Sequence, residues 1–155
     1  MEKYKTISSE ETIEFGGKIG RKFSETRLFL ISGDYGVGKT TFIKGLVAGI
    51  FQPERDDVKQ EIIDSVKSPS FTLVNEYDFA EMTVYHSDFY RLNSVDDIDF
   101  IDFEEILQQK NKRVIIEWFD KISSLKELRK DFQHLVIQLH YDGETERIFS
   151  LEHNS

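Results

Sequence analysis

The sequence of 155 residues contains no cysteine and no long apolar stretch. Without cysteine, the chain forms no disulfide, holds no thiolate zinc site and has no cysteine nucleophile. A membrane helix needs about 18 consecutive apolar residues, and the first residues, Met1–Thr6, are polar, unlike a signal peptide. These absences predict a soluble, cytoplasmic protein with no membrane association.

A surplus of positive charge is also missing. Lysine and arginine number 20 against 29 aspartates and glutamates, which gives a formal net charge of −9. Binding to nucleic acid requires cations clustered against the phosphate backbone. The chain is therefore not expected to bind RNA tightly by itself, although a partner protein could hold the RNA. The length and the 39% of hydrophobic residues predict one domain over residues 1–155.

The most informative segment is Gly33–Thr40, GDYGVGKT, which matches the phosphate-binding loop G-x-x-x-x-G-K-[ST]. It follows the apolar run Leu28–Ile31 and precedes a segment typical of a helix. Glycines let backbone amides approach phosphate oxygens, and the helix N-terminus attracts the same anion. Lys39 is expected to contact the β- and γ-phosphates, and Thr40 to bind Mg²⁺. The segment predicts binding of a nucleoside triphosphate.

Strand and helix patterns alternate around this loop. The expected helices cover residues 9–24, 39–51 and 96–109, and the expected strands cover residues 27–32, 71–77, 82–86, 113–117, 134–141 and 146–151. Gln52–Val66 is interpreted as a mobile connection because it combines Pro53 with mixed charges. This order predicts a three-layer α/β P-loop NTPase fold with a largely parallel central sheet and an antiparallel C-terminal hairpin.

Two acidic residues end apolar strands. Asp88 and Glu117 are candidates for Mg²⁺ or water positioning, because open α/β sheets bind ligands at the carboxyl ends of their strands. Each could instead form a surface ion pair.

Three further positions each have two interpretations. His86 is either a proton acceptor or a hydrogen-bonded strand histidine, and Trp118 either covers a base or fills the core. Ser68–Thr72 is either a γ-phosphate-sensing switch or an ordinary polar turn.

Together these segments resemble the TsaE (YjeE) family, the P-loop ATPases of bacterial tRNA threonylcarbamoyladenosine biosynthesis. The resemblance rests on GDYGVGKTTF at residues 33–42, SPSFTLVNEY at 68–77, HSDFYRL at 86–92 and IEW at 116–118. It implies ATP and Mg²⁺ binding and slow ATP hydrolysis by the isolated protein. It also implies association with the TsaB and TsaD proteins, which modify adenosine 37 of tRNAs reading A-starting codons.

The resemblance also assigns roles to residues. Lys39 and Asp88 would be catalytic, Thr40 and Glu117 would serve the magnesium, and Thr12 would lie near the nucleotide base. The expected nucleotide-binding residues are Thr12, Asp34, Tyr35, Gly36, Val37, Gly38, Lys39, Thr40, Thr41 and Trp118. The chain departs from the family pattern at Tyr35, where leucine is common, and at Ser70, where threonine is usual.

Three other functions fit a phosphate loop. A small-metabolite kinase is the main alternative, but it usually needs an arginine-rich lid, and the connection after the second helix holds only Arg55. A GTPase is disfavoured because Asn111–Val114 lacks the aspartate of a guanine-reading N-K-x-D sequence. A non-catalytic protein that uses ATP to hold an interface open also remains. Arg91 is the obvious cation near the motifs, either for catalysis or for an ion pair.

Overall fold

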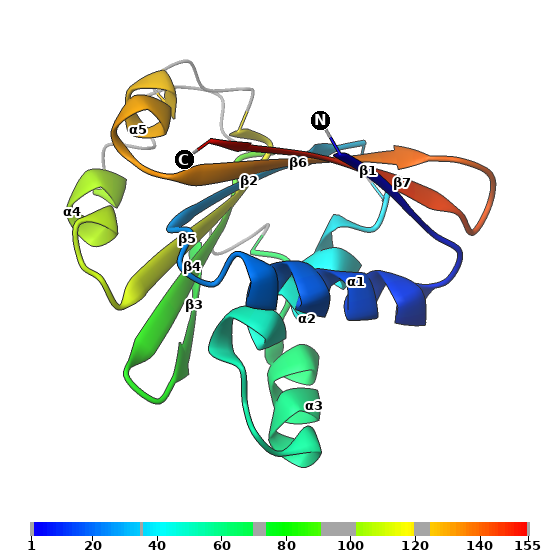
Figure 1. The fold of residues 1–155 in the computed structure, drawn as a ribbon, viewed down its shortest axis with the longest axis horizontal. Coiled ribbons are helices and arrows are strands. Elements are labelled where there is room, and N and C mark those ends of the chain that lie inside the picture. Colours follow the sequence, from blue (N-terminus) through cyan, green and yellow to red (C-terminus); the bar gives the residue numbers. More distant parts are fainter. Residues whose placement is uncertain (1, 35, 70–73, 91–101, 120–124, 155) are drawn as a thin grey trace. The chain divides into compact units, whose positions relative to one another are not determined.

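The computed structural model describes residues 2–34, 36–69, 74–90, 102–119 and 125–154 (Figure 1). The strands are β1 (Glu2–Thr6), β2 (Leu28–Gly33), β3 (Val74–Phe79), β4 (Met82–Asp88), β5 (Lys112–Glu117), β6 (His134–Tyr141) and β7 (Arg147–Asn154). The helices are α1 (Ser9–Lys22), α2 (Lys39–Phe51), α3 (Asp56–Ser65), α4 (Phe103–Leu107) and α5 (Leu125–Asp131). Among these described helices, none is both long enough and apolar enough to span a membrane.

The seven strands are hydrogen-bonded in the order β1-β7-β6-β2-β5-β4-β3. At its centre β5 pairs in parallel with both β2 and β4, whereas β3 is antiparallel to β4 and β1 is antiparallel to β7. A tight turn joins β6 to β7, closed by the Asp142 amide donating to the Glu146 carbonyl at 3.0 Å. So short a connection allows only an antiparallel pair. The predicted α/β fold with parallel central strands and a C-terminal hairpin is confirmed.

By packing, the chain divides into two compact units, each assembled from separate stretches. The first contains residues 1–25, 33–68 and 138–151, and the second contains residues 26–32, 69–137 and 152–155. The phosphate loop belongs to the first unit. Asp88 and Glu117 belong to the second. The expectation of a single ATPase domain over residues 1–155 stays a prediction.

Within the first unit, helices α1 and α2 pack backbone against backbone. Ser8 caps α1 by accepting a hydrogen bond from the Glu11 amide, and the Glu11 carboxylate accepts one from the Ile7 amide, one residue before the cap. A Cβ atom on Gly45 of α2 would collide with the carbonyl oxygen of Ile13 in α1. Close approach therefore requires glycine at this crossing.

Aromatic rings fill the space between α1, α2 and the neighbouring strands of the first unit. Phe15 lies 5.9 Å from Phe42 and 4.8 Å from Phe149, measured between ring centroids. Phe42 and Phe149 are 5.1 Å apart, and Tyr4 of β1 lies 5.0 Å from Phe15. These tilted pairs are the favoured geometry for aromatic packing and fix α2, which begins at the phosphate loop.

The expected mobile connection at Gln52–Val66 is wrong, because Asp56–Ser65 forms helix α3. Asp56 and Asp57 lie in its first turn, where negative charge is stabilised by the helix dipole. At its other end, Lys44 of α2 donates hydrogen bonds to the carbonyl oxygens of Ile63 and Val66, at 3.2 and 2.8 Å. The charges that resembled a solvated loop are helix-start signals.

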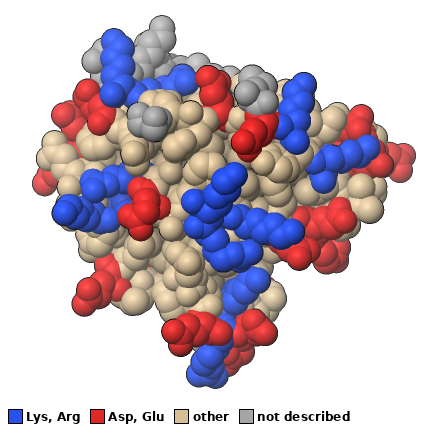
Figure 2. All heavy atoms as spheres, in the orientation of Figure 1, with Lys and Arg blue, Asp and Glu red and all other residues tan. Residues whose placement is uncertain are grey.

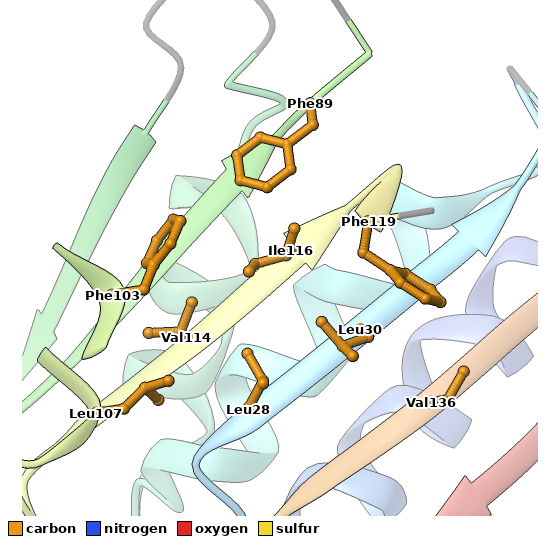
Figure 3. Close-up of a cluster of buried hydrophobic side chains, with 9 residues drawn as sticks. All are labelled: Leu28, Leu30, Phe89, Phe103, Leu107, Val114, Ile116, Phe119 and Val136. Atoms are coloured by element: carbon orange, nitrogen blue, oxygen red, sulfur yellow. The ribbon is translucent and has the colours of Figure 1, made fainter. Parts of the chain in front are cut away.

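Within the second unit, side-chain alternation along the parallel strands separates an apolar core from a polar chain of residues. Figure 3 shows Leu28 and Leu30 of β2 and Val114 and Ile116 of β5 grouped with Phe103 and other buried side chains. The alternate positions of β4 and β5 carry His86 and Glu117 instead. The expected helix at residues 96–109 is observed in part as α4, and residues 91–101 lie outside the described residues.

Candidate functional site

The phosphate loop joins β2 to α2 in the first unit. Gly36 and Gly38 have φ angles of 78° and 105°, in the left-handed region where other residues are strained. The Val37 amide donates to the Asp34 carbonyl at 3.1 Å, which closes a turn inside the loop. Val37 itself is buried, whereas Asp34 is exposed. Tyr35 lies outside the described residues.

Lys39 is the first residue of α2 and is almost completely buried. Its Nζ donates to the carbonyl oxygens of Gly33 at 2.6 Å and of Asp34 at 2.9 Å. The ammonium group is thus held against the loop backbone. Thr40, half-buried in the same first turn, follows directly. A cation and an open helix N-terminus at one loop form the arrangement that binds phosphate.

A pocket of about 450 Å³ lies beside this loop, within the size range of small-molecule sites. Its walls are the loop and first turn of α2, the beginning of α1, and the β6–β7 turn. It is lined by Ile7, Ser8, Ser9, Thr12, Gly36, Gly38, Thr41, Glu144, Thr145 and Arg147. The structure therefore brings Thr12, the residue expected near a base, to the same pocket as Gly36, Gly38 and Thr41.

Thr12 is held in place by a short hydrogen-bonded chain. Its Oγ1 lies 2.7 Å from the Oγ1 of Thr6 and donates to the Ser8 carbonyl at 3.0 Å. Thr6 is the last residue of β1 and is paired with Arg147 of β7. The hydroxyl is therefore positioned by β1 and by the helix cap rather than by solvent.

Arg147 is one of the pocket residues that the sequence motifs did not predict. Its Nε donates to the carbonyl oxygen of Val37, inside the phosphate loop, at 2.7 Å. The two residues are far apart in the chain, and no local motif marks this arginine. Only the pairing of β7 with β1 and the hairpin turn places it at the loop.

In the second unit, the two predicted acids lie side by side. Asp88 ends β4 and Glu117 ends β5, and the parallel register pairs them directly. Their exposed fractions are 8% and 2%. The Tyr90 amide donates to Asp88 Oδ1 at 2.9 Å, and the Phe89 amide donates to the Glu117 carbonyl at 3.1 Å. Two buried carboxylates at strand ends are typical of a site, and neither makes the expected alternative of a surface ion pair with a described lysine or arginine.

Glu117 is also the end of a buried polar chain that crosses β3, β4 and β5. His86 Nε2 lies 2.7 Å from Glu117 Oε2, and His86 Nδ1 lies 3.1 Å from the Tyr77 hydroxyl. Asn75 donates to that hydroxyl at 3.4 Å. With an ionised Glu117, the network assigns the proton of a neutral His86 to Nε2 and makes Nδ1 the acceptor from Tyr77. Of its two interpretations, His86 fits the hydrogen-bonded strand histidine.

Trp118 follows Glu117 in the left-handed region, with a φ angle of 59°. Its amide donates to the Ile31 carbonyl at 3.1 Å, and its half-buried ring packs against the apolar core. The ring also lies 5.0 Å from that of Tyr90, which is exposed. One side of Trp118 therefore fills the core while the other contacts an exposed aromatic residue.

The acid pair has the kind of oxygen donors that a magnesium ion binds. Among the described residues, no group of three or more histidines, aspartates or glutamates could enclose a metal. Mg²⁺ bound with phosphates commonly uses one or two protein carboxylates and keeps waters. Asp88 and Glu117 supply such oxygens. Arg91 and residues 70–72 of the expected switch lie outside the described residues, so their roles stay predictions.

Comparison with known proteins identifies the family. The family model for the threonylcarbamoyl adenosine biosynthesis protein TsaE matches residues 6–149. The chain is 32% identical to the TsaE protein of Borreliella burgdorferi, over 72% of this chain and 73% of the relative. It is 32% identical to the TsaE protein of Treponema pallidum, over 76% of this chain and 78% of the relative.

The fold also has a solved counterpart. The crystal structure of Bacillus subtilis YdiB superposes with a TM-score of 0.64 at 24% identity, and the match covers 97% of this chain and 83% of YdiB. This similarity bears on the fold alone and agrees with the predicted α/β architecture. Together with the family model over residues 6–149, these matches establish that the chain belongs to the TsaE family of tRNA threonylcarbamoyladenosine biosynthesis proteins.

Proposed function

We propose that this chain is an ATP-binding, slowly hydrolysing subunit that acts as a nucleotide-dependent switch on a complex of TsaB and TsaD. The observation that carries the proposal is the phosphate loop with buried Lys39 held against its backbone. The loop offers backbone amides and a helix N-terminus, and Lys39 adds the charge that ATP phosphates require. The adjacent pocket has room for the rest of the nucleotide.

In this proposal the first unit binds the nucleotide. Loop residues from Asp34 to Thr41 hold the phosphates, Thr12 lies near the base, and the Thr40 hydroxyl binds Mg²⁺. The half-buried first turn of α2 and the lining of the pocket by Thr12 and Thr41 support these roles. When bound, Mg²⁺ would neutralise developing phosphate charge.

The two acids of the second unit have different roles in this proposal. Glu117 serves the magnesium, because His86 fixes one of its oxygens at 2.7 Å and so orients the carboxylate. Asp88 orients the attacking water or contacts the γ-phosphate, and Trp118 contributes to nucleotide binding.

Family membership and net charge support the proposed partners. The net charge of −9 disfavours direct binding of tRNA. Figure 2 shows a group of adjacent lysine and arginine side chains near the middle of the face that it draws, with aspartates and glutamates around it. We therefore place tRNA binding on TsaB and TsaD, and expect this chain to contact the RNA through them.

Reconstitution with TsaB, TsaD and substrate tRNA tests the proposal. Wild-type protein should hydrolyse ATP slowly alone and faster with both partners, and should support threonylcarbamoylation. Lys39→Ala removes the loop cation and should lower ATP turnover about a hundredfold and stop the modification. Wild-type turnover by Lys39→Ala would contradict the assignment. Fast turnover without partners, with phosphate transferred to a small metabolite, would indicate a kinase instead.

A further inference from the structure

Arg147 is held at one position by contacts on several sides. Besides donating to Val37, it donates from Nη1 to the carbonyl oxygens of Glu144 at 3.3 Å and Glu146 at 3.0 Å. Its guanidinium carbon lies 4.5 Å from the centroid of the Tyr141 ring. Arginine suits such a site because its planar group can donate in several fixed directions while stacking on an aromatic ring.

The turn that holds Arg147 is itself anchored to β1. Lys5 lies 3.1 Å from Asp142 Oδ2 and 2.9 Å from Glu146 Oε2, and the three side chains are about half exposed. The neighbouring β1 residue, Thr6, is the register partner of Arg147. The arginine is therefore fixed by the strand pairing and the turn, with its Nε directed to the phosphate loop.

The contact with Val37 determines the direction of the next amide. A trans peptide is planar, so the Val37 carbonyl and the Gly38 N–H point to opposite sides. A carbonyl fixed by a cation on one side fixes the N–H on the other, and a charged donor also polarises the peptide. Gly38 adopts a left-handed φ angle of 105°, so its amide has conformational freedom that needs such restraint.

We propose that Arg147 is a positioning residue for nucleotide binding, which orients the Gly38 amide toward a bound phosphate by holding the Val37 carbonyl. The inference rests on the proposed ATP binding by this loop. Arg147 acts through the backbone and does not need to touch the phosphate. Its effect is therefore expected on any ligand that carries a polyphosphate, whatever the base.

Two substitutions separate the charge of Arg147 from its geometry. Arg147→Gln removes the charge, and loss of one charge-assisted hydrogen bond should lower ATP·Mg²⁺ affinity about ten- to a hundredfold. Arg147→Lys keeps the charge, but one ammonium cannot occupy the Val37 contact and the turn contacts together. It should therefore recover only part of the affinity. Calorimetric titration measures both, and thermal unfolding checks that each variant folds.

Competition with inorganic tripolyphosphate shows whether Arg147 affects the phosphate loop or the base side of the pocket. If Arg147 positions the loop, Arg147→Gln should weaken tripolyphosphate and ATP by the same factor. Unchanged tripolyphosphate binding would overturn the proposal, because Arg147 would then act on the base side of the pocket. Loss of folding in both Arg147 variants would also overturn it, since the arginine would then support the fold.

Arg129→Gln is the matched control. Arg129 is half-buried, and its guanidinium carbon lies 5.7 Å from the centroid of an aromatic ring, that of Phe119, in the second unit. Its replacement should leave ATP affinity unchanged. If Lys39→Ala abolishes ATP binding while Arg147→Gln leaves it at the wild-type value, this inference fails and the proposed function stands. If wild-type protein binds no ATP, both fail.

Discussion

The phosphate loop and the acid pair are built in opposite ways. The loop is one continuous stretch whose geometry comes from the backbone, with left-handed Gly36 and Gly38 and one buried lysine. The acid pair, Asp88 and Glu117, comes from separate strands brought together by register, and its chemistry resides in buried side chains. Changes in the loop should alter nucleotide binding. Changes at the acids should instead alter hydrolysis, magnesium dependence and folding.

The largest expected difference between the two regions is at Asp88. Asp88→Asn keeps the acceptor oxygen for the Tyr90 amide but removes the charge that would orient the attacking water. Hydrolysis should fall about 10²- to 10⁴-fold, while ATP·Mg²⁺ affinity stays within a few fold of wild type. Single-turnover hydrolysis and equilibrium binding measure the two quantities separately. Loss of both together would show that Asp88 belongs with the loop in binding.

Removing His86, the hydrogen-bond partner of Glu117, should destabilise the folded protein. His86→Ala leaves a buried carboxylate without the histidine at 2.7 Å, which should cost about 3–5 kcal/mol of unfolding free energy in urea denaturation. The double variant His86→Ala/Glu117→Gln removes the unpaired charge and should regain part of that loss. Equal losses in the single and double variants would mean that His86 acts only by packing.

A smaller effect is expected on the metal. Glu117→Gln keeps the size of the side chain and an oxygen for His86, but it removes the negative charge that would bind Mg²⁺ in the proposed site. The magnesium concentration needed for half-maximal nucleotide binding should rise about tenfold, while binding without magnesium changes little. A titration of nucleotide affinity against Mg²⁺ measures this. If Asp88→Asn moves the magnesium midpoint and Glu117→Gln does not, the two roles are exchanged.

The smallest effect is expected at Ser87, which lies between the two polar residues His86 and Asp88. Among the described residues, its Oγ is the buried side-chain polar atom without a hydrogen-bond partner. Ser87→Ala should therefore raise the unfolding free energy by up to about 1 kcal/mol. Thr83→Ala is the control, since Thr83 donates to Asp78 at 2.6 Å and its loss should destabilise the protein. A destabilised Ser87→Ala would contradict this account.

Sequence patterns predicted the loop better than they predicted its surroundings. The motif and the helix from Lys39 to Phe51 are local, so consecutive residues specify them, and the observed α2 has the same bounds. Arg147 reaches Val37 only through strand pairing, and no short stretch of sequence contains that information. Helix α3 was missed because its charges at Asp56 and Asp57 were interpreted as loop surface rather than as a first turn.

The positions of Asp88 and Glu117 at neighbouring strand ends were predictable, because each follows an apolar strand and parallel strands end at the same edge of a sheet. Their roles stay predictions. Their hydrogen bonds were not identified. The contact of His86 with Tyr77 depends on the antiparallel pairing of β3 with β4, and the contact with Glu117 depends on the parallel pairing of β4 with β5. Sequence alternation gives the face of each residue, but it does not give the register that joins them.

Calorimetric titration of Lys39→Ala and Asp88→Asn with ATP·Mg²⁺, carried out in parallel, tests most directly whether the loop controls binding and the acids control hydrolysis. Lys39 Nζ donates hydrogen bonds within the loop, to the carbonyl oxygens of Gly33 and Asp34, whereas Asp88 lies at the end of β4. We expect Lys39→Ala to bind ATP·Mg²⁺ much more weakly than wild type and Asp88→Asn to bind it with nearly wild-type affinity. Wild-type affinity in Lys39→Ala, together with loss of binding in Asp88→Asn, would contradict the account.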